Sequence, residues 1–265
     1  MAALPRLTSI YERQGFDLTT GLNPNHVYGE PVAPFTYLFR NGEILTYAAG
    51  IAVQEIYFLE CLAEVYQPRS ILIVGNSFGW SAVAMALIFP KSRVLAIDAC
   101  GEAAIIEGLE LTNRIADQEG LSNLKAVKGR SPEDLPAVAA LHAKDVPWDM
   151  LFVDGEHTPG QVTADFKAAR SFASPDALWL FHDAVSFGLL GAVRELGKQS
   201  DLIFQPLWRT PSGIAALVPQ ALVGQVAMTL HAFAGSEKTF KQMRDLGKYG
   251  TTECLLKVFR CPELD

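Results

Sequence analysis

Short apolar runs of strand length alternate with amphipathic stretches through the middle of the chain. The predicted strands span residues 71–74, 93–97, 124–128, 148–153 and 177–181. The predicted helices span residues 80–88, 102–118, 160–172 and 186–198, with a further helix start at the Ser131-Pro132-Glu133-Asp134 stretch. Strand–helix units of this length require crossover connections, which predicts a mainly parallel sheet with helices on both faces.

The pattern changes after the fifth predicted strand. Residues 202–208 and 213–218 are both apolar, and only Arg209-Thr-Pro-Ser212 separates them. Because this gap is too short for a parallel crossover, the two stretches are predicted to pair as an antiparallel hairpin. The central part of the chain is therefore expected to form a seven-stranded, mostly parallel sheet that ends in a C-terminal antiparallel hairpin.

Two further segments flank this α/β core. Prolines and Gly29 interrupt residues 23–34, which predicts a loop, and residues 43–66 carry apolar positions at helical spacing until Pro68. The predicted helical tail has an apolar face made by Leu222, Val226, Met228, Leu230 and Phe233. We therefore divide the chain into an N-terminal helical appendage or lid (1–68), a ligand-binding core (69–218) and a helical C-terminal tail (219–265).

Composition narrows the classes of partner. The net charge is −7 and no cluster of Lys and Arg stands out, which disfavours nucleic acid and anionic membranes. No apolar run is long enough for a membrane span, the start of the chain lacks the order of a signal peptide, and the four cysteines form no Cys-x-x-Cys pair. We expect a cytoplasmic protein, in which the two flanking segments are long enough to build a homodimer or a higher homo-oligomer.

A glycine-rich turn directly follows the first strand, in Gly75-Asn-Ser-Phe-Gly79, and Asp98 ends the second strand. A turn of this kind lets a ligand approach the backbone at a helix N-terminus, and an acid at the second strand suits ribose hydroxyls. The middle glycine that admits a pyrophosphate is missing, which argues against NAD, FAD and a dehydrogenase.

Titratable side chains follow the fourth and fifth strands, where ligands bind in such sheets. Asp154 and His157 follow one strand, and His182 and Asp183 follow the other. The turn, Asp98 and these two pairs together resemble the class I S-adenosylmethionine-dependent methyltransferases. Within that class they are similar to the small-molecule O-methyltransferases of cephalosporin, macrolide and rhamnosyl products, and the resemblance covers residues 69–218.

The resemblance implies a Rossmann-like fold, S-adenosylmethionine as the cofactor and a hydroxyl of a small molecule, such as a natural product, as the acceptor. It assigns the methionine part of the cofactor to the glycine-rich turn, the ribose to Asp98, and the adenine to Arg130 and Ser131. The full set of expected cofactor residues is Gly75, Asn76, Ser77, Phe78, Gly79, Ser81, Asp98, Arg130, Ser131, Asp154 and Gly155. Methylation of an amine or a thiol, and a non-catalytic binding subunit, stay open as alternatives.

Two mechanisms fit the titratable residues. In one, Asp154 and Asp183 bind Mg²⁺, which activates the acceptor hydroxyl, although metal-assisted relatives carry an acid where His182 stands. In the other, His182 or His157 acts as a general base without a metal, oriented by Asp183 or Asp154, and we favour this second mechanism. The aromatic side chains expected to shape an acceptor pocket are those of Tyr28, Phe35, Tyr37 and Tyr47.

Overall fold

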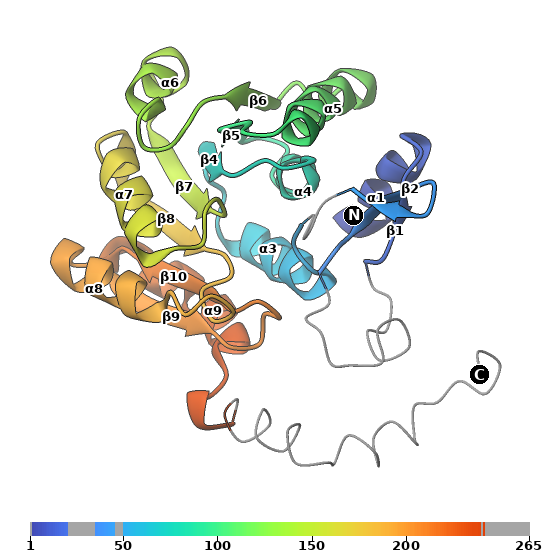
Figure 1. The fold of residues 1–265 in the computed structure, drawn as a ribbon. Helices are drawn as coiled ribbons and strands as arrows, with labels where there is room; N and C mark the ends of the chain where they lie inside the picture. The colour runs from blue at the N-terminus through green and yellow to red at the C-terminus, as the bar shows by residue number, and fades with distance from the viewer. Residues whose placement is uncertain (1, 21–34, 46–49, 240, 242–265) are drawn as a thin grey trace, which may run out of the picture.

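The computed structural model describes residues 2–20, 35–45, 50–239 and 241, and a seven-stranded sheet lies at its centre (Figure 1). In spatial order the strands are β6 (Leu124–Lys128), β5 (Arg93–Asp98), β4 (Ser70–Val74), β7 (Trp148–Val153), β8 (Ala173–Phe181), β10 (Ile214–Val218) and β9 (Ile203–Leu207). Neighbouring strands from β6 to β8 are parallel, and β10 is antiparallel to both β8 and β9. The predicted sheet and its closing hairpin are confirmed.

Helices cover both faces of this sheet (Figure 1). One face carries α4 (Trp80–Ile88) and α5 (Ala103–Glu119), and the other carries α6 (Leu135–His142), α7 (Pro159–Arg170) and α8 (Leu190–Ser200). Alternate residues of one strand serve the two faces, because successive side chains in a strand point in opposite directions. In β4, Ile71 and Ile73 pack on the α4 side, whereas Leu72 and Val74 pack on the α6–α8 side.

The register of the central strands brings their carboxyl ends to one edge of the sheet. Val74 pairs with Ile97 on one side and with Val153 on the other, and Val153 pairs with Phe181. The chain leaves β4 toward β5 and β6 and then returns to β7 on the opposite side of β4. This is a topological switch point, where α/β sheets bind ligands beyond the carboxyl ends of their strands.

The N-terminal segment contains more than the predicted helix. Its elements are α1 (Ala3–Arg13), β1 (Asp17–Leu18), β2 (Leu38–Arg40), β3 (Glu43–Ile44) and α3 (Val53–Val65). The expectation that the chain is helical from residue 43 is wrong for β3, because Asn41 and Gly42, with φ of 54° and 80°, turn the chain back into a β-hairpin. The loop predicted from residue 23 to 34 lies outside the described residues.

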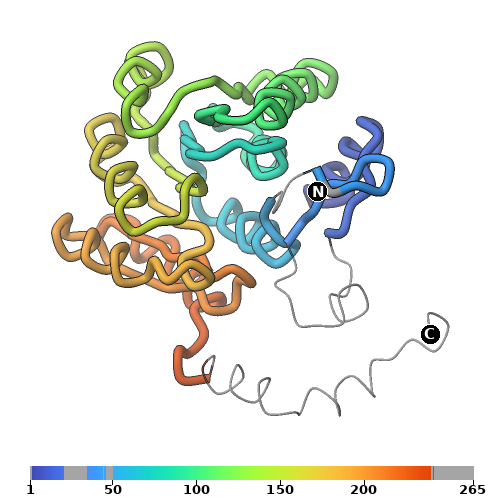
Figure 2. The backbone as a smooth tube through the Cα atoms, in the orientation of Figure 1, coloured from blue at the N-terminus to red at the C-terminus, as the bar shows by residue number. Residues whose placement is uncertain are grey.

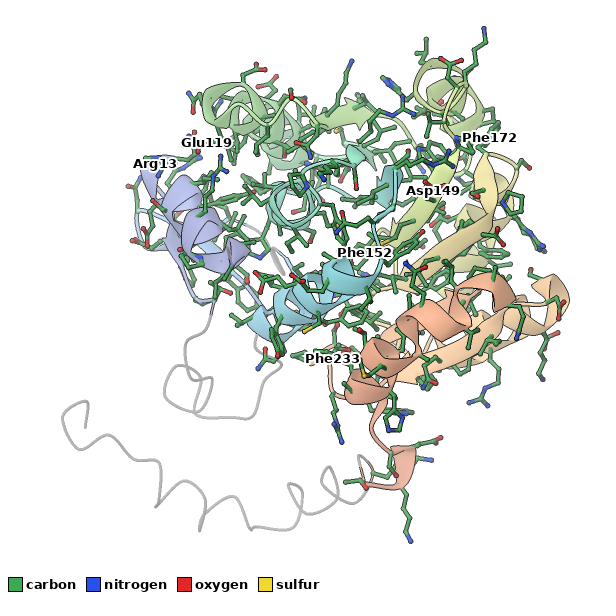
Figure 3. The ribbon with its side chains drawn as sticks, turned by 180° about the vertical axis from the view of Figure 1, so that it is seen from behind. Arg13, Glu119, Asp149, Phe152, Phe172 and Phe233 are labelled. Carbon is green, nitrogen blue, oxygen red and sulfur yellow. The ribbon has the colours of Figure 1, made fainter. Side chains whose placement is uncertain are left out.

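Helices α1 and α3 pack into the same hydrophobic cluster as α4 and one face of the sheet. The Tyr11 ring lies 5.1 Å from that of Trp80, and its hydroxyl donates a hydrogen bond of 2.8 Å to the carbonyl of Phe78. Phe58 of α3 contacts Phe233, labelled in Figure 3, with ring centroids 5.2 Å apart. The backbone then passes from α3 into β4 (Figure 2). The domain division at residue 68 stays a prediction.

The chain ends, within the described residues, with η1 (Gln220–Leu222) and α9 (Val223–Ala234). Val226, Leu230 and Phe233 are buried as predicted, but Met228 is 79% exposed. Met228 is two residues from Val226 and therefore points to the opposite side of the helix. The prediction that Met228 belongs to the apolar face is wrong. Residue 240 and residues 242–265 of the predicted tail lie outside the description. None of the helices in the described part of the chain is long and apolar enough to cross a bilayer.

Candidate active site

A cavity of about 420 Å³ lies at the carboxyl ends of the central strands, a volume that suits a small-molecule ligand. Most of the residues predicted to form the site line it together. These are Gly75, Asn76, Ser77, Ser81, Asp98, Arg130, Ser131, Asp154, Gly155, His157, His182 and Asp183. Two predicted residues, Phe78 and Gly79, are not among its lining residues, and the structure gives them a different place.

The glycine-rich turn owes its shape to two backbone conformations that favour glycine. Gly75 has φ of +99°, and a Cβ atom there would lie 2.1 Å from the backbone oxygen of Asp154. Gly79 has φ of +79° and is the N-cap residue of α4. The Phe78 side chain points into the core, where its ring packs 6.2 Å from that of Phe16. Phe78 and Gly79 therefore shape the turn and do not face the ligand space.

Asp98 holds this turn from the neighbouring strand. Its Oδ2 accepts hydrogen bonds from the backbone N–H groups of Asn76 (2.8 Å) and Ser77 (2.9 Å), and its Oδ1 accepts one from Cys100 (3.0 Å). Two backbone N–H groups at the start of the turn are thus paired within the protein.

A second set of polar side chains joins the loop after β6 to α7, and it consists of Ser131, Gln161 and Asp165. The Ser131 hydroxyl donates a hydrogen bond of 2.5 Å to Asp165 Oδ1, and the Gln161 amide donates to the same oxygen and to the Ser131 carbonyl. Ser131 therefore binds Asp165 instead of capping a helix, and α6 begins only at Leu135. Burial raises the pKa of Asp165, and its Oδ2 is buried without a hydrogen-bond partner among the described residues.

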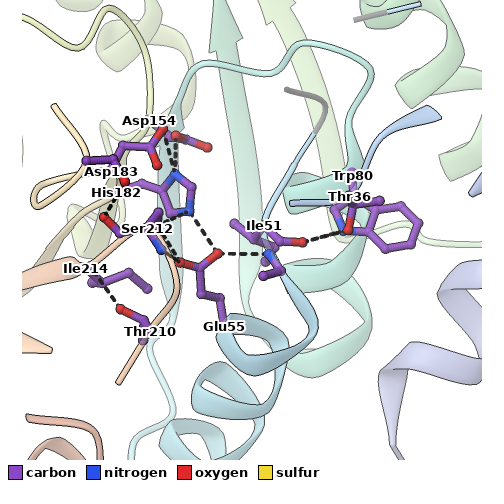
Figure 4. Close-up of polar contacts among 12 residues, drawn as sticks. Thr36, Ile51, Glu55, Trp80, Asp154, His182, Asp183, Thr210, Ser212 and Ile214 are labelled. Atoms are coloured by element: carbon purple, nitrogen blue, oxygen red, sulfur yellow. Dashed lines mark hydrogen bonds and ion pairs between the residues drawn. The ribbon is translucent and has the colours of Figure 1, made fainter. Parts of the chain in front are cut away.

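The buried imidazole of His182 is the centre of the titratable cluster (Figure 4). Its Nδ1 lies 2.8 Å from Asp154 Oδ1, and its Nε2 lies 3.0 Å from Oε2 of Glu55 and 3.1 Å from the Ser212 hydroxyl. Sequence reasoning missed Glu55 and Ser212. Glu55 stands in the first turn of α3, where it also accepts the Ala52 backbone N–H, so its local signal is that of an ordinary helix cap.

Three carboxylates, those of Glu55, Asp154 and Asp183, surround the imidazole of His182. Burial alone would lower the pKa of His182, but the negative charges of Asp154 and Glu55 outweigh it and raise that pKa well above its usual value. Burial likewise raises the pKa of Glu55 and of Asp154, and the charge of His182 outweighs it and lowers both. The raised pKa of His182 and the protein groups at both of its ring nitrogens disfavour it as the group that takes up a proton. The expectation that His182 acts as a base stays a prediction.

These pKa directions predict how stability depends on pH in metal-free protein. The contribution of Glu55 and Asp154 is present above their unfolded pKa values of about 4 and is lost in acid, because their folded pKa values are lower. The contribution of His182 is complete below its unfolded pKa of about 6.5 and is lost as pH rises toward its higher folded pKa. Urea unfolding should show stability decreasing from pH 6.5 to 9 in the wild type, and a smaller decrease in His182→Gln. Equal slopes would contradict the charge assignment.

His157 lies at the more open side of the cluster. Its Nε2 is 3.4 Å from Asp154 Oδ1 and 3.3 Å from Asp183 Oδ2, and its side chain is 22% exposed. The ring stacks on Phe187 with centroids 4.6 Å apart. The two carboxylates and the stacking hold this imidazole at the cavity wall, where it can meet a substrate.

The cluster was also the predicted site of Mg²⁺. Asp154, His157, His182 and Asp183 each offer one donor atom, and these atoms all lie within 4.8 Å of one another. Two of the four donors are imidazole nitrogens, whereas Mg²⁺ takes oxygen ligands in proteins. The donor set therefore does not fit Mg²⁺, and its mixture of nitrogen and oxygen is typical of first-row transition metals.

The N-terminal segment contributes part of the cavity wall. Phe35 and Gly50 line the cavity, as expected for Phe35. Tyr37 is half-buried and is not a lining residue, and Tyr28 and Tyr47 lie outside the described residues. One of the four aromatic residues predicted to shape the pocket is therefore placed at it.

Comparisons with known proteins agree with this geometry. Residues 72–184 match the family described as "Methyltransferase domain". A catechol O-methyltransferase of Niastella koreensis is 25% identical over 143 residues, which make up 53% of this chain and 61% of that enzyme. The chain therefore spans less than two thirds of this relative.

Two solved structures share the fold. The O-methyltransferase of Bacillus cereus in complex with SAH is 18% identical, with a TM-score of 0.52 over 64% of this chain and 83% of that one. The O-methyltransferase TomG of Streptomyces achromogenes, in complex with SAM, is 22% identical, with a TM-score of 0.53 over 65% and 83%. Residues 72–184 are therefore similar to a methyltransferase domain, and the sheet with its helices has the fold of these two O-methyltransferases.

Proposed function

We propose that the protein transfers the methyl group of S-adenosylmethionine to a hydroxyl group of a small molecule. The observation that carries the proposal is the cavity at the switch point of the sheet, which the glycine-rich turn and Asp98 line together with the cluster of His157 and His182. One part of this cavity has the groups that a nucleoside needs, and the other has groups that handle a proton.

The cofactor fits this division of the cavity. The ribose would face Asp98, whose carboxylate ends β5, and the methionine part would lie along Gly75 and Asn76. The adenine would lie near Ser131 and Asp165, where the unpaired Oδ2 of Asp165 lacks the hydrogen-bond donor that an exocyclic amino group supplies. The methyl group would then point toward the cluster.

The transfer itself is a displacement at the methyl carbon. A lone pair of the acceptor oxygen forms the new C–O bond while the C–S bond breaks, and its electron pair stays on sulfur as a thioether. The hydroxyl proton goes to Nδ1 of His157, because Nε2 faces the carboxylates of Asp154 and Asp183. His157 suits this role because it is partly exposed, lines the cavity and is oriented by Asp154 and Asp183. His182 is surrounded by protein groups on both ring nitrogens and acts as a positioning residue.

The proposed class of acceptor rests on the similar proteins. TomG is an O-methyltransferase involved in tomaymycin synthesis, and the Niastella protein is a catechol O-methyltransferase, which supports a hydroxyl acceptor of the natural-product type. An amine or thiol acceptor is the alternative on the same site. Formation of S-adenosylhomocysteine with matched phenol, aniline and thiophenol acceptors tests the proposal: turnover with the phenol is expected, and turnover with the amine or thiol alone would contradict it.

A substitution at Asp98 tests the cofactor side of the site. Asp98→Asn should weaken binding of S-adenosylmethionine by about 10- to 100-fold, because it removes the charge that holds three backbone N–H groups and that would face the ribose. Calorimetry with the folded variant measures this change. The matched control is Asp145→Asn, which changes an exposed aspartate that does not line the cavity and should bind S-adenosylmethionine like the wild type. Equal affinities of both variants would contradict the role of Asp98.

A further inference from the structure

We propose that Glu55, in the first turn of α3, is a positioning residue that holds His157 in place for the methyl transfer. Glu55 does not line the cavity, and it acts through His182 and Ser212. The proposal rests on the proposed function, because it concerns the placement of the group that takes up the acceptor proton. It gives the N-terminal segment a part in the reaction in addition to its part in the core.

Glu55 places a carboxylate in the interior of the protein, with a side chain that is 0% exposed. Such a group is almost never fully buried unless it is paired and its lone pairs are satisfied. Its Oε2 accepts the Ala52 backbone N–H at 2.8 Å and lies 3.0 Å from Nε2 of His182. Its Oε1 accepts the Ser212 hydroxyl (Figure 4). The helix cap accounts only for the Ala52 contact, and the other two contacts link α3 to the loops of the active site.

The first path from Glu55 to His157 runs through the ring of His182. A carboxylate only accepts hydrogen bonds, so the contact with Glu55 places a proton on Nε2 of His182. The ring is then fixed with its Nδ1 2.8 Å from Oδ1 of Asp154. The same oxygen of Asp154 lies 3.4 Å from Nε2 of His157. Glu55 thus fixes, through one imidazole, a carboxylate that orients the proposed base.

The second path runs through Ser212, in the turn between β9 and β10. Its hydroxyl and its backbone N–H both donate to Oε1 of Glu55. Its carbonyl accepts hydrogen bonds of 3.1 Å from the backbone N–H and from the hydroxyl of Ser186. Ser186 directly precedes Phe187, whose ring stacks on His157. The carboxylate of Glu55 therefore reaches His157 from two sides.

The two loops of the second path are packed too closely to absorb a shift of Glu55. Gly213 has φ of +76°, and a Cβ atom there would lie 2.1 Å from Cγ2 of Val185. The Val185 N–H also donates a hydrogen bond of 3.3 Å to the Gly213 carbonyl. Close-packed interiors transmit such shifts, and a misplacement of about 1 Å at a reacting group can cost about 10²-fold in rate. Removing the charge of Glu55 should therefore slow the transfer and leave ligand binding intact.

The experiment compares Glu55→Gln with Glu64→Gln, the same substitution at an exposed position of α3. Glutamine keeps an oxygen that can accept the Ala52 N–H and removes the charge that holds His182. With the phenol acceptor, kcat of Glu55→Gln should fall by about 10- to 100-fold. KM for the acceptor and Kd for S-adenosylmethionine should stay within about twofold, and Glu64→Gln should match the wild type in all three quantities.

A double-mutant cycle shows whether Glu55 acts through His157. Adding Glu55→Gln to His157→Gln should lower kcat by less than about twofold, because the group that Glu55 positions is already missing. Equal losses in both backgrounds would overturn the two paths. Ser212→Ala removes a hydroxyl that holds Glu55 but keeps the charge, and it should lower kcat by about 3- to 10-fold.

Thermal melts show whether each variant is folded. If Glu55→Gln does not fold, Ser212→Ala decides, and wild-type kcat in that variant would overturn the proposal. A folded wild type that forms no S-adenosylhomocysteine with any acceptor would overturn the proposed function and the role of Glu55 together. An active wild type beside a folded Glu55→Gln with unchanged kcat would overturn the role of Glu55 alone.

Discussion

Replacing Gly75 by alanine is expected to lower the free energy of unfolding by about 3 kcal/mol or more, the range of severe core substitutions. Two penalties add at this position. The φ of +99° is one that residues with a Cβ atom rarely adopt, and the added atom would lie 2.1 Å from the carbonyl oxygen of Asp154. Relief requires the ends of β4 and β7 to move apart, and these two ends carry both sides of the cavity.

A second glycine beside the same edge of the sheet provides the control. Gly101, three residues after the end of β5, has open space around the position of a Cβ atom. Gly101→Ala should therefore change stability by no more than about 0.5 kcal/mol. Urea unfolding of both variants measures the difference. A Gly75→Ala protein as stable as Gly101→Ala would show that the turn tolerates a side chain and that the close approach to Asp154 is incorrect.

The second large effect is expected for His157→Gln, which should reduce turnover by about 10²- to 10⁴-fold. The variant keeps a polar side chain of similar size but removes the group that would take the acceptor proton. Affinity for S-adenosylmethionine should stay within about twofold, because the cofactor side of the cavity is formed by other residues. Single-turnover rates and calorimetry on the same preparation measure the two quantities separately.

A matched histidine distinguishes this effect from general loss of structure. His142, in the last turn of α6, does not line the cavity, and His142→Gln should keep wild-type turnover. Full turnover of His157→Gln at neutral pH would remove His157 from the role of base.

The sheet was predictable because each of its strands carries its own signal. The runs at 71–74, 148–153 and 177–181 are almost entirely apolar, as expected for parallel strands with both faces covered. The short gap between β9 and β10 excluded a crossover. The N-terminal strands were missed because β1 and β3 have only two residues each, too few to show any periodicity.

The side chains of the candidate site were predictable only where they come directly at the end of a strand. Asp98, Asp154 and His182 each come directly after an apolar run, so the topology alone brought them together. Glu55 could not be found in this way, because it lies 127 residues from His182 in sequence and reaches it only through the packing of α3. Phe78 was predicted to contact the cofactor, but the turn directs its side chain into the core. The direction of that side chain depends on the φ and ψ angles of the turn, which the residue type does not reveal.

The most direct test of the central claim is calorimetry of the purified protein with S-adenosylmethionine and, in parallel, with NAD. We predict one S-adenosylmethionine bound per chain with a dissociation constant in the range of about 1 to 100 μM, and no heat with NAD. Both ligands share adenine and ribose, so the comparison isolates the part of the site next to Gly75. A folded protein that gives no heat with S-adenosylmethionine, or that binds NAD as tightly, would contradict the account.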